Sequence, residues 1–169
     1  MLSSDSTPNH AKWMGSLIVN LQSLELAFRG FLYNCETGWT RQRGSRFFDD
    51  MAKGQQLEEN AFTNYDTLRE LIKKFNKEVQ SRHLNIQVDP AIARIRDSLA
   101  HGRIASLSPS LDEPLRLVKY SKPSNNRVYV TDYHVLTGKW FDEQTEMVGK
   151  SIQSVVEAMA LFEGQKHSS

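Results

Sequence analysis

Apolar residues recur every three or four positions in four segments of the chain, which is the period of one face of an α-helix. The first segment covers about residues 8–35 and the last about residues 141–162, with two shorter ones beginning near residues 63 and 89. The four apolar stripes are, in chain order, Trp13, Met14, Leu17, Ile18, Leu21, Leu24, Phe28 and Leu32; Phe62, Tyr65, Leu68, Leu71, Ile72, Phe75 and Val79; Ile92, Ile95 and Leu99; and Met147, Val148, Ile152, Val155, Val156, Met159 and Phe162. We therefore predict four amphipathic helices.

Residues that favour helix ends bound these segments. The first and third helices each open with a capping residue followed by proline, at Thr7–Pro8 and Asp89–Pro90. In the second helix, Thr63 followed three residues later by Asp66 resembles a capping box. Gly102 is expected to end the third helix.

Two runs rich in β-branched and aromatic residues, 115–120 and 127–135, flank the sequence SKPSNN. Proline and paired asparagines are typical of a turn, so residues 115–135 are predicted to form a β-hairpin. A two-stranded hairpin is marginally stable in water by itself. We therefore expect it to pack against the helices.

Four apolar helix faces have to be buried against one another. The simplest arrangement is a mainly α fold, an antiparallel four-helix bundle with the β-hairpin inserted before the last helix. The length of 169 residues suits one domain with one core. We predict a single domain over residues 8–163, with a long loop at 36–61 and tails at 1–7 and 164–169.

The predicted loop 36–61 has no steady hydrophobic period and is unusually long for a compact domain. It places Arg41, Arg43 and Arg46 beside Trp39 and the pair Phe47–Phe48. One interpretation is a solvated loop whose aromatic residues pack onto the bundle. The other is an arm that binds RNA, in which arginines contact phosphates and aromatic rings stack on bases.

Composition and charge narrow the classes of function. Net charge is +1, so any nucleic-acid binding has to come from a local basic patch. The single cysteine, Cys35, excludes an internal disulfide and a cysteine-based zinc site, which fits a cytoplasmic protein. The N-terminal residues do not resemble a signal peptide, and no apolar run is long enough to span a bilayer. We expect no cofactor, no metal and no membrane partner.

The sequence RIRDSLAHGRI, residues 94–104, combines Arg96 and His101 at the end of the predicted third helix. Asp97 lies four residues before His101, on the same helix face, where its carboxylate can orient the imidazole. A histidine with a pKa near 7 is a capable general acid or base, and an arginine can stabilise charge on a phosphate. The alternative is structural, because a histidine at a helix C-terminus also complements the helix dipole.

The stretch RDSLAH resembles the Arg-x4-His motif of the HEPN superfamily, which commonly reads Arg-Asn-x-x-x-His. The order of the predicted elements is similar as well, with two long helices, a third that ends in the motif, and a final helix. The resemblance implies an all-α bundle that often forms homodimers and, in active members, cleaves RNA without a metal. Many members act in toxin–antitoxin or antiviral defence systems. Asp97 departs from the family pattern, because asparagine is usual after the arginine.

The resemblance implies Arg96 and His101 as catalytic residues. Our first hypothesis adds Asp97, which orients His101, and takes Arg41, Arg43, Arg46 and Arg103 as RNA contacts. The expected function is a metal-independent endoribonuclease that acts through attack of the ribose 2′-hydroxyl. Expected partners are RNA, a second copy of the chain, and an antitoxin or other protein. Two alternatives stay open: a non-catalytic HEPN-like module that binds a protein or nucleotide, and a scaffold in which Arg96 and His101 only stabilise a dimer.

Overall fold

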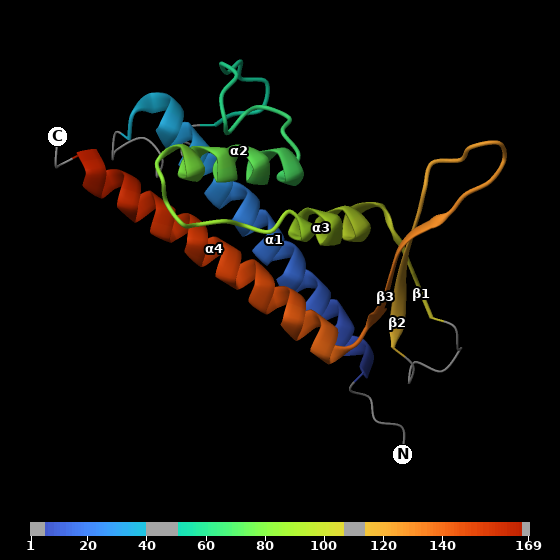
Figure 1. The fold of residues 1–169 in the computed structure, drawn as a ribbon. Coiled ribbons are helices and arrows are strands. Elements are labelled where there is room, and N and C mark those ends of the chain that lie inside the picture. Colours follow the sequence, from blue (N-terminus) through green and yellow to red (C-terminus); the bar gives the residue numbers. More distant parts are fainter. Residues whose placement is uncertain (1–5, 40–50, 107–113, 167–169) are drawn as a thin grey trace. The chain divides into compact units, whose positions relative to one another are not determined.

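The computed structural model describes residues 6–39, 51–106 and 114–166, with side chains described between residues 9 and 163 of these ranges. This part of the chain is mainly helical, with helices α1 (Ser6–Thr37), α2 (Leu68–Ser81), α3 (Ala91–His101) and α4 (Gly138–Lys166). Strands β1 (Arg103–Ala105), β2 (Leu115–Tyr120) and β3 (Val130–Leu136) follow α3 and precede α4 in the chain (Figure 1). The prediction of a mainly α fold is confirmed.

The chain divides into two compact units. The first, here called the sheet unit, consists of residues 1–21 and 91–149; the second, the helical unit, consists of residues 22–90 and 150–169. Helices α1 and α4 each contribute one part to each unit. A single domain over residues 8–163 and an antiparallel four-helix bundle stay predictions.

Aromatic side chains form the core of the helical unit. Phe31 of α1 lies 4.8 Å from Phe75 of α2 and 4.9 Å from Phe162 of α4, measured between ring centroids, and both pairs are T-shaped. Phe28 lies 5.2 Å from Phe75 in the same geometry, and all four rings are fully buried. Each such pair contributes about 0.5–1.5 kcal/mol beyond the burial of its surface.

Helix α2 is capped by Thr67, so the predicted start at Thr63 is wrong. The side chain of Thr67 accepts a hydrogen bond from the N–H of Glu70, and the Glu70 carboxylate accepts one from the N–H of Thr67, at 2.7 Å. Glutamate can reach back to the cap in this way, whereas Asp66 binds Lys74. The Thr63 hydroxyl donates to the carbonyl oxygen of Glu58 in the preceding turn.

The sheet unit contains a three-stranded antiparallel sheet with the order β1-β2-β3. Strands β2 and β3 form the predicted hairpin, with Leu115 opposite Leu136 and Leu117 opposite His134. Ser124 and Arg127 pair at its tip, where both intervening asparagines have positive φ, at 50° and 59°. A type I′ turn requires this backbone conformation, which asparagine tolerates. The third strand, β1, was not predicted, because three residues are too few to produce a visible alternation.

Gly102 joins α3 to β1 where there is no room for a side chain. A Cβ atom there would lie 2.4 Å from the carbonyl oxygen of Ser98 and 2.6 Å from Cδ1 of Leu117 on β2. The N–H of Gly102 donates to the same carbonyl of Ser98, at 2.7 Å. The predicted end of α3 at Gly102 is confirmed, and close packing against β2 explains the glycine.

Three predicted core positions lie on the surface instead. Ile18 and Val156 are exposed, and Tyr65 is 101% exposed. The buried seam of α1 passes through Leu17 and Leu21, so Ile18 is rotated about 100° away from it. Tyr65 precedes α2 and is therefore outside the helical period that placed it in the stripe.

Candidate functional site at the end of α3

The predicted catalytic residues lie near the C-terminal end of α3, in the sheet unit. Asp97 and His101 are one helical turn apart, with 3.6 Å between Asp97 Oδ1 and His101 Nε2. The His101 side chain is 65% exposed, so a ligand can reach its ring from solvent. The carboxylate and the imidazole are therefore close to each other, at slightly more than hydrogen-bond distance, and the imidazole is accessible.

Lys119 of β2 is a third member of this group, and it was not predicted from the sequence. Its ammonium forms an ion pair with Asp97 Oδ2, the carboxylate oxygen that does not face His101. The Lys119 side chain is more buried than that of either partner. One carboxylate thus bridges a cation from the sheet and an imidazole at the helix end, and its negative charge is balanced locally.

Arg96 lies on the same helix but is not part of this chain of contacts. It is exposed, like the neighbouring Arg94. Residues five apart are separated by about 140° around a helix, so the side chains of Arg96 and His101 project from different sides of α3. The structure brings Asp97 and His101 together and leaves Arg96 apart from them.

The predicted RNA-binding residues divide into two groups. Arg103 is the first residue of β1 and is exposed, with its guanidinium carbon 5.5 Å from the centre of the Tyr120 ring. Arg41, Arg43 and Arg46 lie outside the described residues. The choice between the two interpretations of the loop 36–61 therefore stays open.

A second polar group links α3 to the inner face of the sheet. Ser98 is fully buried, and its hydroxyl donates a 2.6 Å hydrogen bond to Asp132 Oδ2 on β3. Asp132 Oδ1 lies 2.9 Å from His134 Nε2. Burial acts to raise the pKa of Asp132, but the hydrogen bond from Ser98 and the charges of His134 and Arg94 outweigh it, and the pKa is lowered.

The group of Ser98, Asp132 and His134 has a structural rather than a catalytic geometry. The serine is fully buried, and its hydroxyl contacts the carboxylate rather than the imidazole, so it does not form the serine–histidine pair of a nucleophilic site. The His134 ring packs on Trp140 of α4, with 5.4 Å between centroids. These contacts join α3, β3 and the start of α4 around the candidate site.

Two sequence signals point to these missed residues. Ser98 follows Ile95 by three positions, so it falls on the inner face of α3, where a polar residue needs a partner. Lys119 follows Leu115 and Leu117 at a spacing of two, which places it on the covered face of β2. In both cases a polar residue interrupts an apolar period.

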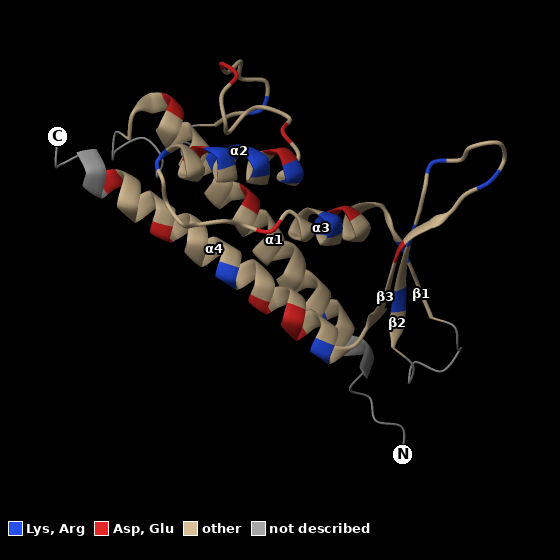
Figure 2. Cartoon of the chain, in the orientation of Figure 1, with Lys and Arg blue, Asp and Glu red and all other residues tan. Residues whose placement is uncertain are grey.

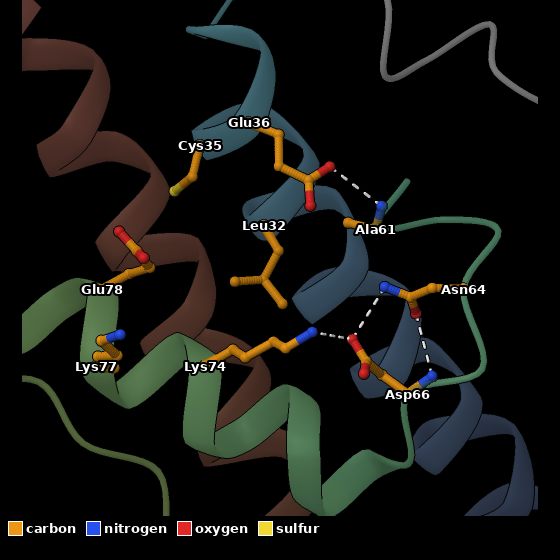
Figure 3. A pocket seen from close by; sticks show the side chains of 9 residues that line it. All are labelled: Leu32, Cys35, Glu36, Ala61, Asn64, Asp66, Lys74, Lys77 and Glu78. Carbon is orange, nitrogen blue, oxygen red and sulfur yellow. Dashed lines mark hydrogen bonds and ion pairs between the residues drawn. The ribbon is translucent and has the colours of Figure 1, made fainter. Parts of the chain in front are cut away.

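The helical unit contains a pocket of about 370 Å³. Figure 3 shows its lining side chains, which come from α1, α2 and the segment between them: Leu32, Cys35, Glu36, Ala61, Asn64, Asp66, Lys74, Lys77 and Glu78. Several polar groups in it are paired, since Glu36 accepts from the N–H of Ala61 and Asp66 accepts from Lys74. Burial raises the pKa of the Cys35 thiol to about 11, which keeps the sulfur protonated and unreactive near neutral pH.

The described part of the chain has neither a candidate metal site nor a membrane-spanning helix. In the ranges that the structure describes, histidine, cysteine, aspartate and glutamate do not form a group of three or more that could hold a metal ion. None of the helices in those ranges is long and apolar enough to cross a bilayer.

The end of α3 therefore combines an exposed imidazole, a carboxylate that contacts it, and a lysine that neutralises the carboxylate. Comparison of the chain with protein-family models, with curated proteins and with solved structures finds no match.

Proposed function

We propose that this chain is a HEPN-like protein with a helical-bundle fold that cleaves RNA without a metal. Support comes from the Arg-x4-His spacing of Arg96 and His101 and from its place at the end of α3, with α4 following later in the chain. The observation that carries the proposal is the bridging position of Asp97 between Lys119 and the exposed His101.

The proposed reaction is attack of a ribose 2′-oxygen on the adjacent phosphorus. His101 acts as general base and takes the proton of the 2′-hydroxyl while water protonates the leaving 5′-oxygen, or it acts as general acid for that oxygen while water takes the proton of the 2′-hydroxyl. The P–O5′ bond breaks, which leaves a 2′,3′-cyclic phosphate and a 5′-hydroxyl. Arg96 stabilises the charge that develops on the phosphoryl oxygens. Asp97 orients the His101 ring through Oδ1.

The pairing with Lys119 removes the main chemical objection to an aspartate at position 97. An unpaired carboxylate near the site would repel an RNA phosphate, whereas asparagine would not. Because Lys119 binds Oδ2, the pair of Asp97 and Lys119 carries no net charge. The remaining oxygen can orient His101 as an asparagine carbonyl would.

The same geometry supports the proposal of a homodimer. Since Arg96 and His101 diverge around one α3, a composite site needs the arginine of one protomer to meet the histidine of the other. We propose such a dimer, acting in the cytoplasm in a toxin–antitoxin or antiviral system, with an antitoxin or another protein as its regulator.

The test is cleavage of RNA by the purified full-length chain in excess chelator. We expect products with 2′,3′-cyclic phosphate ends from the wild-type chain and their loss in His101→Ala and Arg96→Ala. His83→Asn is the matched control, because His83 is exposed and asparagine tolerates its left-handed backbone, with φ of 58°. Cleavage that persists in His101→Ala excludes the proposed mechanism.

A chain that binds RNA or a protein partner but does not turn RNA over would fit the non-catalytic module instead. Size measurements separate this outcome from a scaffold. If Arg96→Ala abolishes a dimer and no variant affects any activity, then Arg96 and His101 serve assembly alone.

A further inference from the structure

The outer face of the three-stranded sheet is the face opposite to the one that contacts α3 through Ser98 and Asp97. It displays aromatic and basic side chains together. On this face Val118 of β2 lies between Arg103 of β1 and Tyr133 of β3, to both of which it is directly opposite. Strand alternation places Arg116 and Tyr120 on the same face as Val118. The two tyrosines, Tyr120 and Tyr133, are 42% and 51% exposed, so both rings are accessible from solvent.

Each of these tyrosines is paired with an arginine of the same face. The Nε–H of Arg116 donates to the hydroxyl of Tyr133, at 3.0 Å. The Arg103 guanidinium lies over the Tyr120 ring at 5.5 Å, near the outer limit of about 6 Å for a cation–π contact. The arginines hold the rings in place and leave much of the ring surface open to solvent.

The charge of this region differs from that of the chain as a whole. Residues 114–131 contain four basic side chains, Arg116, Lys119, Lys122 and Arg127, and no acidic one, although the chain has a net charge of +1. The loop that joins β2 and β3 likewise carries basic and no acidic positions (Figure 2). The first carboxylate after this segment, Asp132, is on the inner face with Ser98. Lys119 is paired with Asp97 on the covered face, so Arg116, Lys122 and Arg127 supply the local basic patch that a polyanion requires.

We propose that the outer face of β1, β2 and β3 binds single-stranded RNA, an inference that takes its choice of nucleic acid from the proposed function. Unpaired bases stack on Tyr120 and Tyr133, and phosphates are bound by Arg103 and by Lys122 and Arg127 of the hairpin loop. Aromatic rings on a sheet can stack only on unpaired bases, because the bases of a duplex are stacked on one another. This surface therefore selects single strands over duplexes.

The position of this face relative to His101 agrees with the choice of ligand. His101 and Arg103 are separated by Gly102 alone, so their Cα atoms lie at most about 7 Å apart. That is roughly the spacing of adjacent nucleotides in an extended strand. Lys119, which pairs with Asp97 beside His101, lies on the covered face, and β1 is an edge strand of the sheet. A strand held by Arg103 on the outer face therefore has to cross this edge to reach the imidazole.

The experiment measures RNA binding separately from cleavage. Full-length His101→Ala, which cannot consume its ligand under the proposed mechanism, is titrated into a fluorescein-labelled RNA strand of about 12 nucleotides, a usual site size. Fluorescence anisotropy gives the Kd. We expect Tyr120→Leu and Tyr133→Leu, made in this background, each to raise the Kd at least about fivefold, which is the effect of losing one stacked base.

Matched controls use residues of the same type in the helical unit. Tyr65→Leu removes a fully exposed tyrosine and should leave the Kd unchanged. Salt dependence tests the arginine: Arg103→Gln should reduce the slope of log K against log salt by about 0.7, the value for one phosphate contact to a single strand. Arg69→Gln, at an exposed position of α2, should leave that slope unchanged.

Four results would overturn the proposal. The first three are no RNA binding, binding that neither tyrosine variant changes, and equal affinity for a duplex of the same sequence. The fourth is a tyrosine variant that no longer self-associates but still binds RNA. The last would identify the face as a protein interface. Failure of the proposed function looks different. In that case the wild-type chain binds RNA through the tyrosines but does not cleave it. This result supports the binding surface and excludes a catalytic role for His101.

Discussion

Ser98→Ala tests the buried polar link between α3 and the sheet. In the native chain the fully buried hydroxyl donates a 2.6 Å hydrogen bond to the Asp132 carboxylate, whose side chain is only 13% exposed. Alanine removes this donor and leaves the carboxylate with less compensation for its burial. We expect a less stable protein with unchanged secondary structure.

The magnitude follows from two opposing terms. A hydrogen bond to a charged group contributes about 1.5–3 kcal/mol to stability. Alanine has a helix propensity about 0.5 kcal/mol more favourable than that of serine, which offsets part of the loss. The net cost at pH 7 is therefore about 2 kcal/mol. With a urea m-value of about 2 kcal/mol/M, the unfolding midpoint falls by about 1 M.

The cost depends on pH because the hydrogen bond helps to lower the pKa of Asp132 from its ordinary value of 3.8. A carboxyl with a lowered pKa stabilises the fold above its unfolded-state pKa, and this stabilisation is lost as pH falls through the lowered value. Once Asp132 is protonated, Ser98 binds a neutral group, which contributes only about 0.5–1.5 kcal/mol. The difference between the two proteins should therefore shrink below about pH 4.

The assay is urea unfolding followed by circular dichroism at pH 7 and at the lowest pH at which both proteins are folded. Ser154→Ala, whose hydroxyl bonds within α4 at an exposed position, is the control and should be neutral or slightly stabilising. A cost below about 0.5 kcal/mol at pH 7, or the same cost at both pH values, would refute the assigned role of the charged hydrogen bond.

Three further predictions concern the helix ends and the candidate site. Gly102→Ala should destabilise the protein by about 1–3 kcal/mol in urea unfolding because its Cβ would overlap a backbone oxygen, whereas Gly149→Ala, with nothing within 4 Å, should stabilise α4 by up to about 1 kcal/mol. Thr67→Ala should cost about 1 kcal/mol by the same measurement, since α2 loses its cap; no cost would contradict the observed capping box. Lys119→Gln should lower kcat/KM for RNA about fivefold, because an unneutralised Asp97 about 8 Å from a phosphate costs about 1 kcal/mol, and equal activity would exclude this neutralisation.

Local patterns were enough to predict the helices and the hairpin. The seam through Leu17, Leu21 and Leu24 is buried as its spacing indicates, and the paired asparagines form the turn. The cap of α2 was misplaced because two threonines, each followed three residues later by an acidic residue, compete in this segment. Only Thr67 has a glutamate long enough to close the box.

The candidate site was predictable as far as it lies on one helix. The i,i+4 relation of Asp97 and His101 can be read directly from the sequence. Lys119 is 22 residues away from Asp97, and the two meet only because β2 packs against α3. Such a contact belongs to the tertiary structure, and the sequence shows only a lysine on the apolar face of a strand.

The near-neutral net charge of the chain conceals an uneven distribution that bears on how RNA would be recognised. The chain has 21 basic and 20 acidic residues, and residues 114–131 hold four basic and no acidic ones, which leaves 17 basic and 20 acidic elsewhere, a net charge of −3. A polyanion is therefore attracted to the hairpin and repelled by the rest of the chain on average. Such a distribution orients a strand before it makes contact, and it favours a defined path over general adhesion. The same distribution explains why total charge is a poor guide here: a chain with a net charge of +1 contains a hairpin segment with four basic and no acidic residues.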